Sequence, residues 1–181
     1  TNKEYLTLQA AFDESESGDT IQMLRNVTTL STAQSITISE EKNVILDLNG
    51  YTMNSGAEKT FINNGTLKIV DSSEEKQGKI IGNGVKIIEN DGELTIEDTT
   101  IEGIINTPEL INNRNILKIK ESNINVNSTN NEIINNEENG TLEISDSTIS
   151  TKETGGHNIL NSGKAIINNT QFNFVYCYSS S

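Results

Sequence analysis

Four acidic residues recur at one position of a repeated pattern, and their type and spacing make them the best candidates for chemistry in this chain. Each stands two residues after the isoleucine of a Leu-x-Ile step, and each is followed by serine or threonine. Carboxylates stacked one above another offer the oxygen ligands that calcium prefers. Two of them at a suitable separation would also form the acid and base that cleave a glycosidic bond. The four residues are Asp71, Asp98, Glu121 and Asp146.

A structural role explains the same column without any ligand. Asp-Ser and Asp-Thr pairs are typical of tight corners, where their side chains cap the turn. The column also runs along the length of the repeat, whereas a catalytic pair would occupy one place in it. We therefore interpret the four as corner residues and assign no catalytic residue, no ligand-binding residue and no cofactor. Calcium bound by this column is the alternative.

The repeat that positions these residues is built on a Leu-x-Ile step. Successive steps are separated by roughly two dozen residues, and in most copies another apolar residue follows five positions later. Because the step alternates with period two, both apolar side chains face one side of a short strand, which equivalent strands from neighbouring coils must cover. The copies are Leu46/Leu48, Leu67/Ile69, Leu94/Ile96, Leu117/Ile119, Leu142/Ile144 and Ala165/Ile167, and the following residues are Met53, Ile80 (delayed by an insertion at 71–78), Ile101, Ile124, Ile149 and Phe172.

A second element of the repeat reads apolar-apolar-Asn-Asn. Stacked asparagines are expected to hydrogen-bond to the next asparagine or to backbone groups, as ladders do in cross-β stacks. Asn-Gly and Asp-Gly pairs at Gly50, Gly65, Gly84, Gly92 and Gly140 predict tight corners with positive φ. The aligned segments are 61–64, 87–90, 110–113, 133–136 and 159–162, with Ile21/Met23 and Ile36/Ile38 as degenerate earlier members.

The two ends of the chain read differently from the repeat. Leu8, Ala11 and Phe12 recur at helical spacing, with Thr7 as the expected N-cap and Gly18 as the stop, so a short helix should cover the first coil. We expect one domain over 1–181, with a cap at 1–20, coils at 21–175 and a tail or link at 176–181. Alternating aromatics at 172–178 predict a last strand, a cap or an interface.

Composition excludes two classes of partner. The net charge is −13, from 26 acidic and 13 basic residues, which repels a nucleic-acid backbone and an anionic membrane surface. No run of about 18 apolar residues is present, so no membrane insertion is expected. Thr1 is not a natural start, and we therefore interpret the chain as part of a larger polypeptide.

The residues resemble the pectate-lyase-like superfamily of parallel β-helices. Tyr5–Ala11 followed by Ser17–Ile21 is similar to the opening of many members, and Val44–Met53 resembles their strand and turn. The Gly-Thr-Leu-x-Ile repeats resemble those of bacterial surface and adhesin-type β-helices. The fold class that follows is all-β, a single-stranded right-handed parallel β-helix (a β-solenoid) of about six to seven coils with a short N-terminal capping helix.

Few residues fit the catalytic roles of that superfamily. A lyase would need a basic proton acceptor, but Arg25 and Arg114 are far apart, and Arg114 falls in a repeat turn where we expect it to be solvated. Asp47 lies between two inward leucines and should point outward in a structural role. His157 follows two glycines and is expected in a solvated loop, and Cys177, the sole cysteine, forms no intramolecular disulfide.

These observations predict an extracellular or cell-surface module of a bacterial protein. We expect it to be non-catalytic, and either to bind carbohydrate or a host surface protein along one lateral face or to act as a rigid stalk. The alternative is a fragment of a polysaccharide lyase or glycoside hydrolase. Two outward carboxylates about 5–10 Å apart in a deep groove would favour the enzyme. A shallow flank would favour binding.

Overall fold

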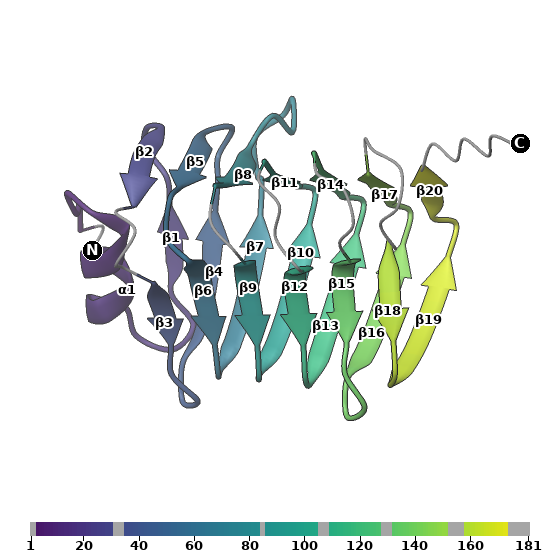
Figure 1. Cartoon of the computed structure of the whole chain (residues 1–181). Helices are drawn as coiled ribbons and strands as arrows, with labels where there is room; N and C mark the ends of the chain where they lie inside the picture. Colours follow the sequence, from purple (N-terminus) through teal and green to yellow (C-terminus); the bar gives the residue numbers. More distant parts are fainter. Residues whose placement is uncertain are drawn as a thin grey trace, which may run out of the picture.

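The chain winds into a stack of coils, each built from three short strands (Figure 1). The structure is a computed structural model that describes residues 3–30, 35–83, 86–104, 109–127, 132–151 and 158–173. Within these ranges six coils of three strands are followed by the first two strands of a seventh. No helix in the described ranges is long and apolar enough to cross a membrane.

Equivalent strands of successive coils pair in parallel and form three sheets. Sheet A contains β1 (Thr20–Gln22), β4 (Asn43–Asp47), β7 (Thr66–Val70), β10 (Glu93–Glu97), β13 (Ile116–Lys120), β16 (Thr141–Ser145) and β19 (Lys164–Asn168). Sheet B contains β2 (Val27–Leu30), β5 (Thr52–Ser55), β8 (Lys79–Gly82), β11 (Thr100–Gly103), β14 (Asn123–Val126), β17 (Thr148–Thr151) and β20 (Gln171–Asn173). Sheet C contains β3 (Ile36–Ile38), β6 (Lys59–Asn63), β9 (Lys86–Asn90), β12 (Glu109–Asn113), β15 (Glu132–Asn136) and β18 (Ile159–Asn161).

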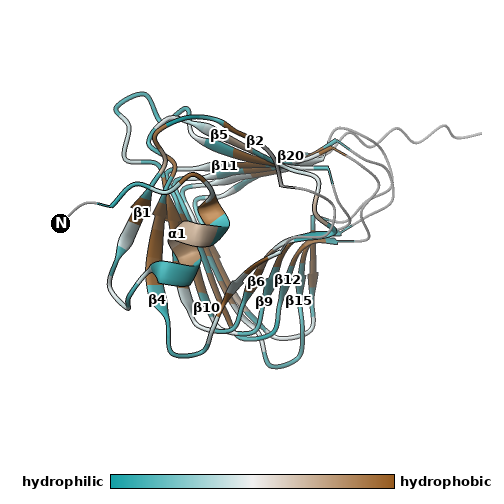
Figure 2. Cartoon of the chain, turned by 90° about the vertical axis from the view of Figure 1, so that its left-hand side faces the viewer, coloured by the Kyte–Doolittle hydropathy of each residue, from teal (hydrophilic) through white to brown (hydrophobic). Residues whose placement is uncertain are grey.

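The hand of the winding follows from the order of the sheets. Viewed from the N-terminal end, the chain passes from sheet A on the left to sheet B at the top and then to sheet C, and it recedes from the viewer (Figure 2). A clockwise path that recedes is a right-handed coil. The predicted fold class, an all-β right-handed parallel β-helix with one short helix near the N-terminus, is confirmed.

The core consists of continuous columns of aliphatic side chains. In sheet A, Leu94 pairs with Leu67 and Leu117, and Ile96 pairs with Ile69 and Ile119, and all six are at most 1% exposed. Each fully buried side chain of this size contributes about 1.5–3 kcal/mol, but only while neighbouring coils cover it. A further column in sheet B consists of Met53, Ile80, Ile101, Ile124 and Ile149, as predicted, including the delayed Ile80.

The register corrects the first copy of the repeat. Val44 pairs with Leu67 and Leu46 pairs with Ile69, so the first Leu-x-Ile step is Val44/Leu46 and not Leu46/Leu48. The error arises at the corner after β4, which holds two more residues than the corner after β10. Counting back from Met53 therefore shifts the alignment by two residues.

The asparagine pattern is also shifted in two coils. Asn63 pairs with Asn90, so the segment predicted at 61–64 lies one residue too late and is 60–63. Asn161 pairs with Asn136, so the segment predicted at 159–162 is likewise 158–161. The predicted ladder itself is confirmed. We name it the Asn ladder, and its members are Asn63, Asn90, Asn113, Asn136 and Asn161.

Positive φ falls mostly at residues other than the predicted glycines. Of the described Asn-Gly and Asp-Gly corners only Gly50, with φ of 79°, adopts it. Gly92 is required for a different reason: a Cβ there would lie 2.0 Å from the carbonyl oxygen of Gly65 in the coil below. The close approach of successive backbones therefore selects glycine at this corner, and Gly84 lies outside the described residues.

The helix α1 (Leu8–Glu14) closes the N-terminal end of the stack (Figure 2). Its predicted N-cap is confirmed, because Thr7 Oγ1 accepts a hydrogen bond from the Ala10 N–H at 3.2 Å. Phe12 is 1% exposed and its ring lies 6.3 Å from that of Phe61. The helix ends at Glu14, earlier than the predicted stop at Gly18.

Candidate functional site

The acidic column divides into two environments. Asp98, Glu121 and Asp146 have φ values of 54°, 48° and 50°, and each stands at the corner between sheets A and B. The Asp98 carboxylate lies 3.2 Å from Lys76 Nζ, and Asp146 Oδ1 accepts a hydrogen bond from Asn169 Nδ2 at 2.6 Å. Asn169 continues the same position with φ of 42°. These residues stand at the corner, as predicted, but the side-chain contacts found for Asp98 and Asp146 are with Lys76 and Asn169 and not with the turn backbone.

Asp71 occupies the same position of the repeat as these three residues, but its side chain lies in a different environment. Its side chain is fully buried and accepts hydrogen bonds from the N–H groups of Gly50 at 2.7 Å, Ser73 at 3.1 Å and Gly78 at 2.5 Å. Burial alone would raise the pKa of Asp71, but these bonds outweigh it and hold the pKa below its ordinary value. Asp71 therefore organises the insertion between β7 and β8.

The hydroxyl residues that follow the column line the corner from inside. The Thr99 N–H donates to Ser122 Oγ at 3.2 Å, and the Ser122 N–H donates to Ser147 Oγ at 3.1 Å. Ser147 Oγ in turn donates to the Ser145 carbonyl oxygen at 2.6 Å. The corner therefore satisfies its backbone groups with its own side chains.

The described residues bring no metal-binding group together. No three of the histidine, cysteine and acidic side chains in these ranges lie close enough to hold a metal ion. A calcium site at the acidic column stays a prediction. His157 and Cys177 lie outside the described residues.

Asp47 has the structural role that was predicted, but it is not solvated. The residue is 4% exposed, and its carboxylate accepts hydrogen bonds from Gln22 Nε2 at 2.8 Å, from Ser72 Oγ at 2.7 Å and from the N–H groups of Ser72 and Asn49. Burial alone would raise the pKa of Asp47, but these donors keep it below its ordinary value. Asp47 thus joins three successive coils.

Arg114 makes contacts that the sequence did not reveal. Its Nη1 lies 2.8 Å from Glu89 Oε1 and 3.1 Å from Asp91 Oδ1, and its Nε lies 2.9 Å from Glu137 Oε1. Burial alone would lower the pKa of Arg114, but these carboxylates raise it. The Arg114 side chain is 39% exposed, as expected for a surface residue, but it also links three successive coils, which the expectation did not include. Among the described residues, Arg25 makes one contact, a 3.4 Å hydrogen bond to the Leu6 carbonyl oxygen.

The outer faces of sheets A and C are covered by charged side chains that pair across coils. In sheet A, Lys118 Nζ lies 2.9 Å from Glu93 Oε1, and Lys68 pairs with Glu97. In sheet C, Lys86 Nζ lies 2.6 Å from Glu109 Oε1, and a second carboxylate oxygen of Glu109 accepts a hydrogen bond from Asn135. Several charged side chains of these two faces are thus paired with one another across coils, whereas Glu143 and Glu132 form no ion pair with the described residues.

The outer face of sheet B is different in its C-terminal half. Six consecutive outward positions on β14, β17 and β20 carry amide or hydroxyl groups and no charge. Among them one internal hydrogen bond forms, from Ser150 Oγ to Asn125 Oδ1 at 2.5 Å. We name this surface the amide–hydroxyl strip, and its members are Asn123, Asn125, Thr148, Ser150, Gln171 and Asn173.

The strip is regular because its strands are in register. Asn123, Thr148 and Gln171 form one row and Asn125, Ser150 and Asn173 a second, and each row advances by about 4.8 Å per strand. Toward the N-terminus, Lys79, Ile81 and Glu102 interrupt the pattern on β8 and β11. The strip therefore offers two parallel rows of hydrogen-bonding groups along the last coils.

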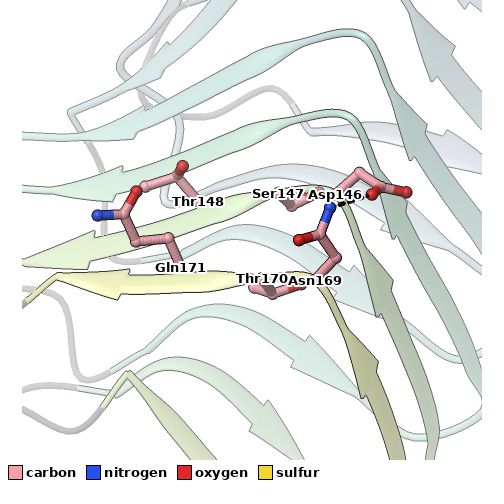
Figure 3. Close-up of a pocket in the computed structure, with 6 residues that line it drawn as sticks. All are labelled: Asp146, Ser147, Thr148, Asn169, Thr170 and Gln171. Carbon is pink, nitrogen blue, oxygen red and sulfur yellow. Dashed lines mark hydrogen bonds between the residues drawn. The ribbon is translucent and has the colours of Figure 1, made fainter.

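A polar depression borders the strip at the corner between sheets A and B. Thr148 and Gln171 lie on its one side, and Asp146 and Asn169 lie on the other with their mutual hydrogen bond (Figure 3). Ser147 and Thr170 lie between them in the figure. At this depression the carboxylate of Asp146 lies beside the amide–hydroxyl strip.

Comparison with known proteins adds no relative. No family model, no curated protein and no solved structure matches this chain. The resemblance to the pectate-lyase-like superfamily and to adhesin-type β-helices therefore stays a prediction, and the parallel solenoid is what the structure shows.

The sequence contains a signal for the amide–hydroxyl strip. The two positions flanking each apolar residue of sheet B point outward, since strand residues alternate. Around Ile124, Ile149 and Phe172 these flanking residues are all uncharged and polar, whereas around Ile80 and Ile101 a lysine and a glutamate appear. The pairing of Arg114 had no such signal, because its partners lie 23 and 25 residues away.

Proposed function

We propose that this chain is a rigid, non-catalytic β-helix module that binds an uncharged polysaccharide along the amide–hydroxyl strip. The observation that carries the proposal is the contrast between the faces. Sheets A and C place several of their outward charges in ion pairs between coils, whereas Asn123, Thr148, Gln171 and Asn173 carry no charge and make no side-chain hydrogen bond to the other described residues.

The chemistry of the strip suits sugar hydroxyl groups. An amide offers both donors and acceptors, and a hydroxyl group offers one donor and two acceptor sites, so each side chain can satisfy a hydroxyl in either role. The net charge of −13 disfavours an acidic polysaccharide through repulsion. Two rows that run along the axis suit an extended chain lying along the coils.

The stiffness of the rod supports the same proposal. The Asn ladder and Arg114 tie successive coils together, so the strip is held in one geometry before a ligand arrives. A preformed site loses less conformational entropy on binding. An extracellular position on a bacterial surface, of the adhesin type that the repeats resemble, is part of this proposal.

A polysaccharide lyase or hydrolase is the second candidate, and the carboxyl groups weigh against it. A general acid needs a raised pKa, so that it is protonated near neutral pH. Asp47, Asp71, Glu89, Glu97 and Glu137 have lowered pKa values, and each is held by donors or cations of neighbouring residues. These five groups are therefore poor proton donors.

A glycan array that contains neutral and acidic polysaccharides, run beside a reducing-sugar release assay, tests the proposal. We expect binding to a neutral polysaccharide without release of reducing ends. The double variant Asn123→Ala/Gln171→Ala should bind about tenfold more weakly, since two hydrogen bonds of about 0.7 kcal/mol each amount to about 1.4 kcal/mol.

The matched control is Thr95→Ala on the outer face of sheet A, which should bind like the unmodified chain. If Thr95→Ala lowered the affinity as much as the double variant, the binding site would not be the amide–hydroxyl strip. Binding of acidic polysaccharides only would refute the uncharged ligand, and release of reducing ends would refute the non-catalytic role and favour the enzyme.

A further inference from the structure

The carboxylate beside the amide–hydroxyl strip differs from its neighbours in the acidic column. Asp98 pairs with Lys76, and Glu121 Oε1 lies 3.5 Å from Lys120 Nζ. Among the three members at the corner, Asp146 alone forms no ion pair with the described residues, and its side chain is exposed. The negative charge of Asp146 is therefore not balanced within the described part of the chain.

The rest of the sequence offers little to balance this charge. On the neighbouring strand β13, Lys120 is already bound by two glutamates. Residues 174–181 contain no lysine, arginine or histidine. Lys152 and His157 follow β17 in the sequence, after the end of that strand that lies away from Asp146. The carboxylate is therefore left for a ligand to neutralise.

The hydrogen bond to Asp146 also fixes how the Asn169 amide faces. A carboxylate only accepts, so Asn169 Nδ2 must face it and Oδ1 must face the other way. In Figure 3 this amide oxygen points toward the side of the depression where Thr148 and Gln171 lie. These three side chains accept no hydrogen bond from the described residues. The depression thus presents free acceptor oxygens with a carboxylate directly behind them.

A primary ammonium group matches this arrangement. It carries three donors and no acceptor, and its charge neutralises the carboxylate. A hydroxyl group would leave that charge unbalanced, and an anionic group would be repelled. Calcium takes about six to eight oxygen ligands, often from several carboxylates, whereas this depression has the single carboxylate of Asp146.

We propose that the depression binds the ammonium group of an amino sugar within the polysaccharide that lies along the amide–hydroxyl strip. The inference rests on the proposed function for the rest of the ligand, and it narrows that ligand to a chain whose sugars are uncharged apart from occasional free amino groups. Thr148 and Gln171 belong to both the strip and the depression, so one chain reaches both. The net charge of −13 attracts such a chain.

Isothermal titration calorimetry with two N-acetylglucosamine oligosaccharides of equal length tests the proposal, one fully acetylated and one partly deacetylated. The unmodified chain should bind the partly deacetylated one about threefold to fivefold more tightly at low salt, the range of an exposed ion pair, and the preference should shrink as salt is added. Asp146→Asn should remove the preference, because asparagine keeps the positive φ of the corner, as Asn169 does, but carries no charge.

The matched control is Asp98→Asn, the same substitution in the same column. It should keep the preference, because the Asp98 carboxylate is already paired with Lys76. Equal binding of both oligosaccharides by the unmodified chain, or a preference that survives in Asp146→Asn, would overturn the proposal.

A titration with single sugars separates this proposal from the proposed function. Glucosamine should shift the side-chain amide signals of Asn169 and Gln171 in the ¹⁵N-labelled chain, and N-acetylglucosamine should not. These shifts without oligosaccharide binding would support the ammonium site and refute the glycan module. Oligosaccharide binding without these shifts would do the reverse. Shifts at equal or lower concentrations of N-acetyl-lysine amide would overturn the amino sugar and favour a lysine of a protein partner.

Discussion

Replacing Asn113 with alanine should remove the centre of the Asn ladder. Asn113 is fully buried, and its Nδ2 donates to Asn136 Oδ1 at 2.6 Å, to the Asn115 carbonyl oxygen at 3.1 Å and to the Thr141 carbonyl oxygen at 3.2 Å. Its Oδ1 accepts from Asn90 Nδ2 at 2.7 Å. The substitution therefore breaks bonds to the coils on both sides.

The magnitude follows from what is left unpaired. Asn136 Oδ1 becomes a buried acceptor without a donor, which costs about 1–3 kcal/mol, and the other lost bonds cost about 0.5–1.5 kcal/mol each. Asn90 keeps its bonds to the Gly92 and Ile116 carbonyl oxygens. We expect Asn113→Ala to lower the free energy of unfolding by about 3–5 kcal/mol, a large share of the total for a domain of this size.

Urea unfolding followed by circular dichroism measures this loss, with Asn161→Ala as the matched control. Asn161 is the last member of the Asn ladder: its Nδ2 makes one bond within its own coil, and its Oδ1 accepts one from Asn136 Nδ2, which keeps two carbonyl acceptors. The control should therefore lose only about 1–2 kcal/mol. Equal losses for Asn113→Ala and Asn161→Ala would refute the cooperative ladder.

The remaining predictions concern the core, the corner, the charged network and pH. Ile119→Asp should cost more than about 4 kcal/mol or prevent folding, because it buries an unpaired charge between two coils; full thermal stability would contradict the register. Asp98→Asn should change the unfolding free energy by less than about 0.5 kcal/mol because asparagine tolerates positive φ, whereas Asp98→Val should be clearly destabilising; similar melting temperatures for the two would contradict the corner assignment. Arg114→Met should cost about 1–3 kcal/mol in urea unfolding, since Glu89 keeps Lys59 as a partner but loses the arginine; no change would show that the network is only solvated surface. The lowered pKa of Glu89 means that its ion pairs stabilise the fold above the ordinary glutamate pKa of about 4.3 and lose this effect as the pH falls below it. The urea midpoint should therefore fall between about pH 5 and 3, and Glu89→Gln should reduce that fall; an equal fall in both proteins would exclude Glu89 as a source.

The repeat predicted the fold because its signal is periodic. Leu94/Ile96, Leu117/Ile119 and Leu142/Ile144 recur with few inserted residues, so counting along the chain gives their register correctly. The corner after Leu46 and Asp47 is two residues longer, so counting residues along the chain gives the wrong register there. At Asn63-Asn64 both residues could face inward, and only the backbone pairing decides between them.

The surface features were harder to predict from the sequence than the fold. Arg114 finds partners in other coils, and their identity depends on the register of three strands and not on local sequence. The column of carboxylates suggested a calcium site or a catalytic pair, because such groups bind cations and transfer protons. In the structure Asp71 binds backbone N–H groups, whereas Asp98 pairs with Lys76, so the two carboxylates lie in separate environments. The amide–hydroxyl strip is defined by the absence of charge at positions such as Asn125 and Ser150, which becomes meaningful only beside the ion-paired faces.

The most direct test of binding along the amide–hydroxyl strip is a titration of the ¹⁵N-labelled chain with the neutral polysaccharide that the array identifies, followed by amide chemical shifts. We expect chemical-shift changes that concentrate on β14, β17 and β20 and include the side-chain amides of Asn123 and Gln171, with the outer faces of sheets A and C unchanged. Shifts that concentrate on sheet A or sheet C would contradict it.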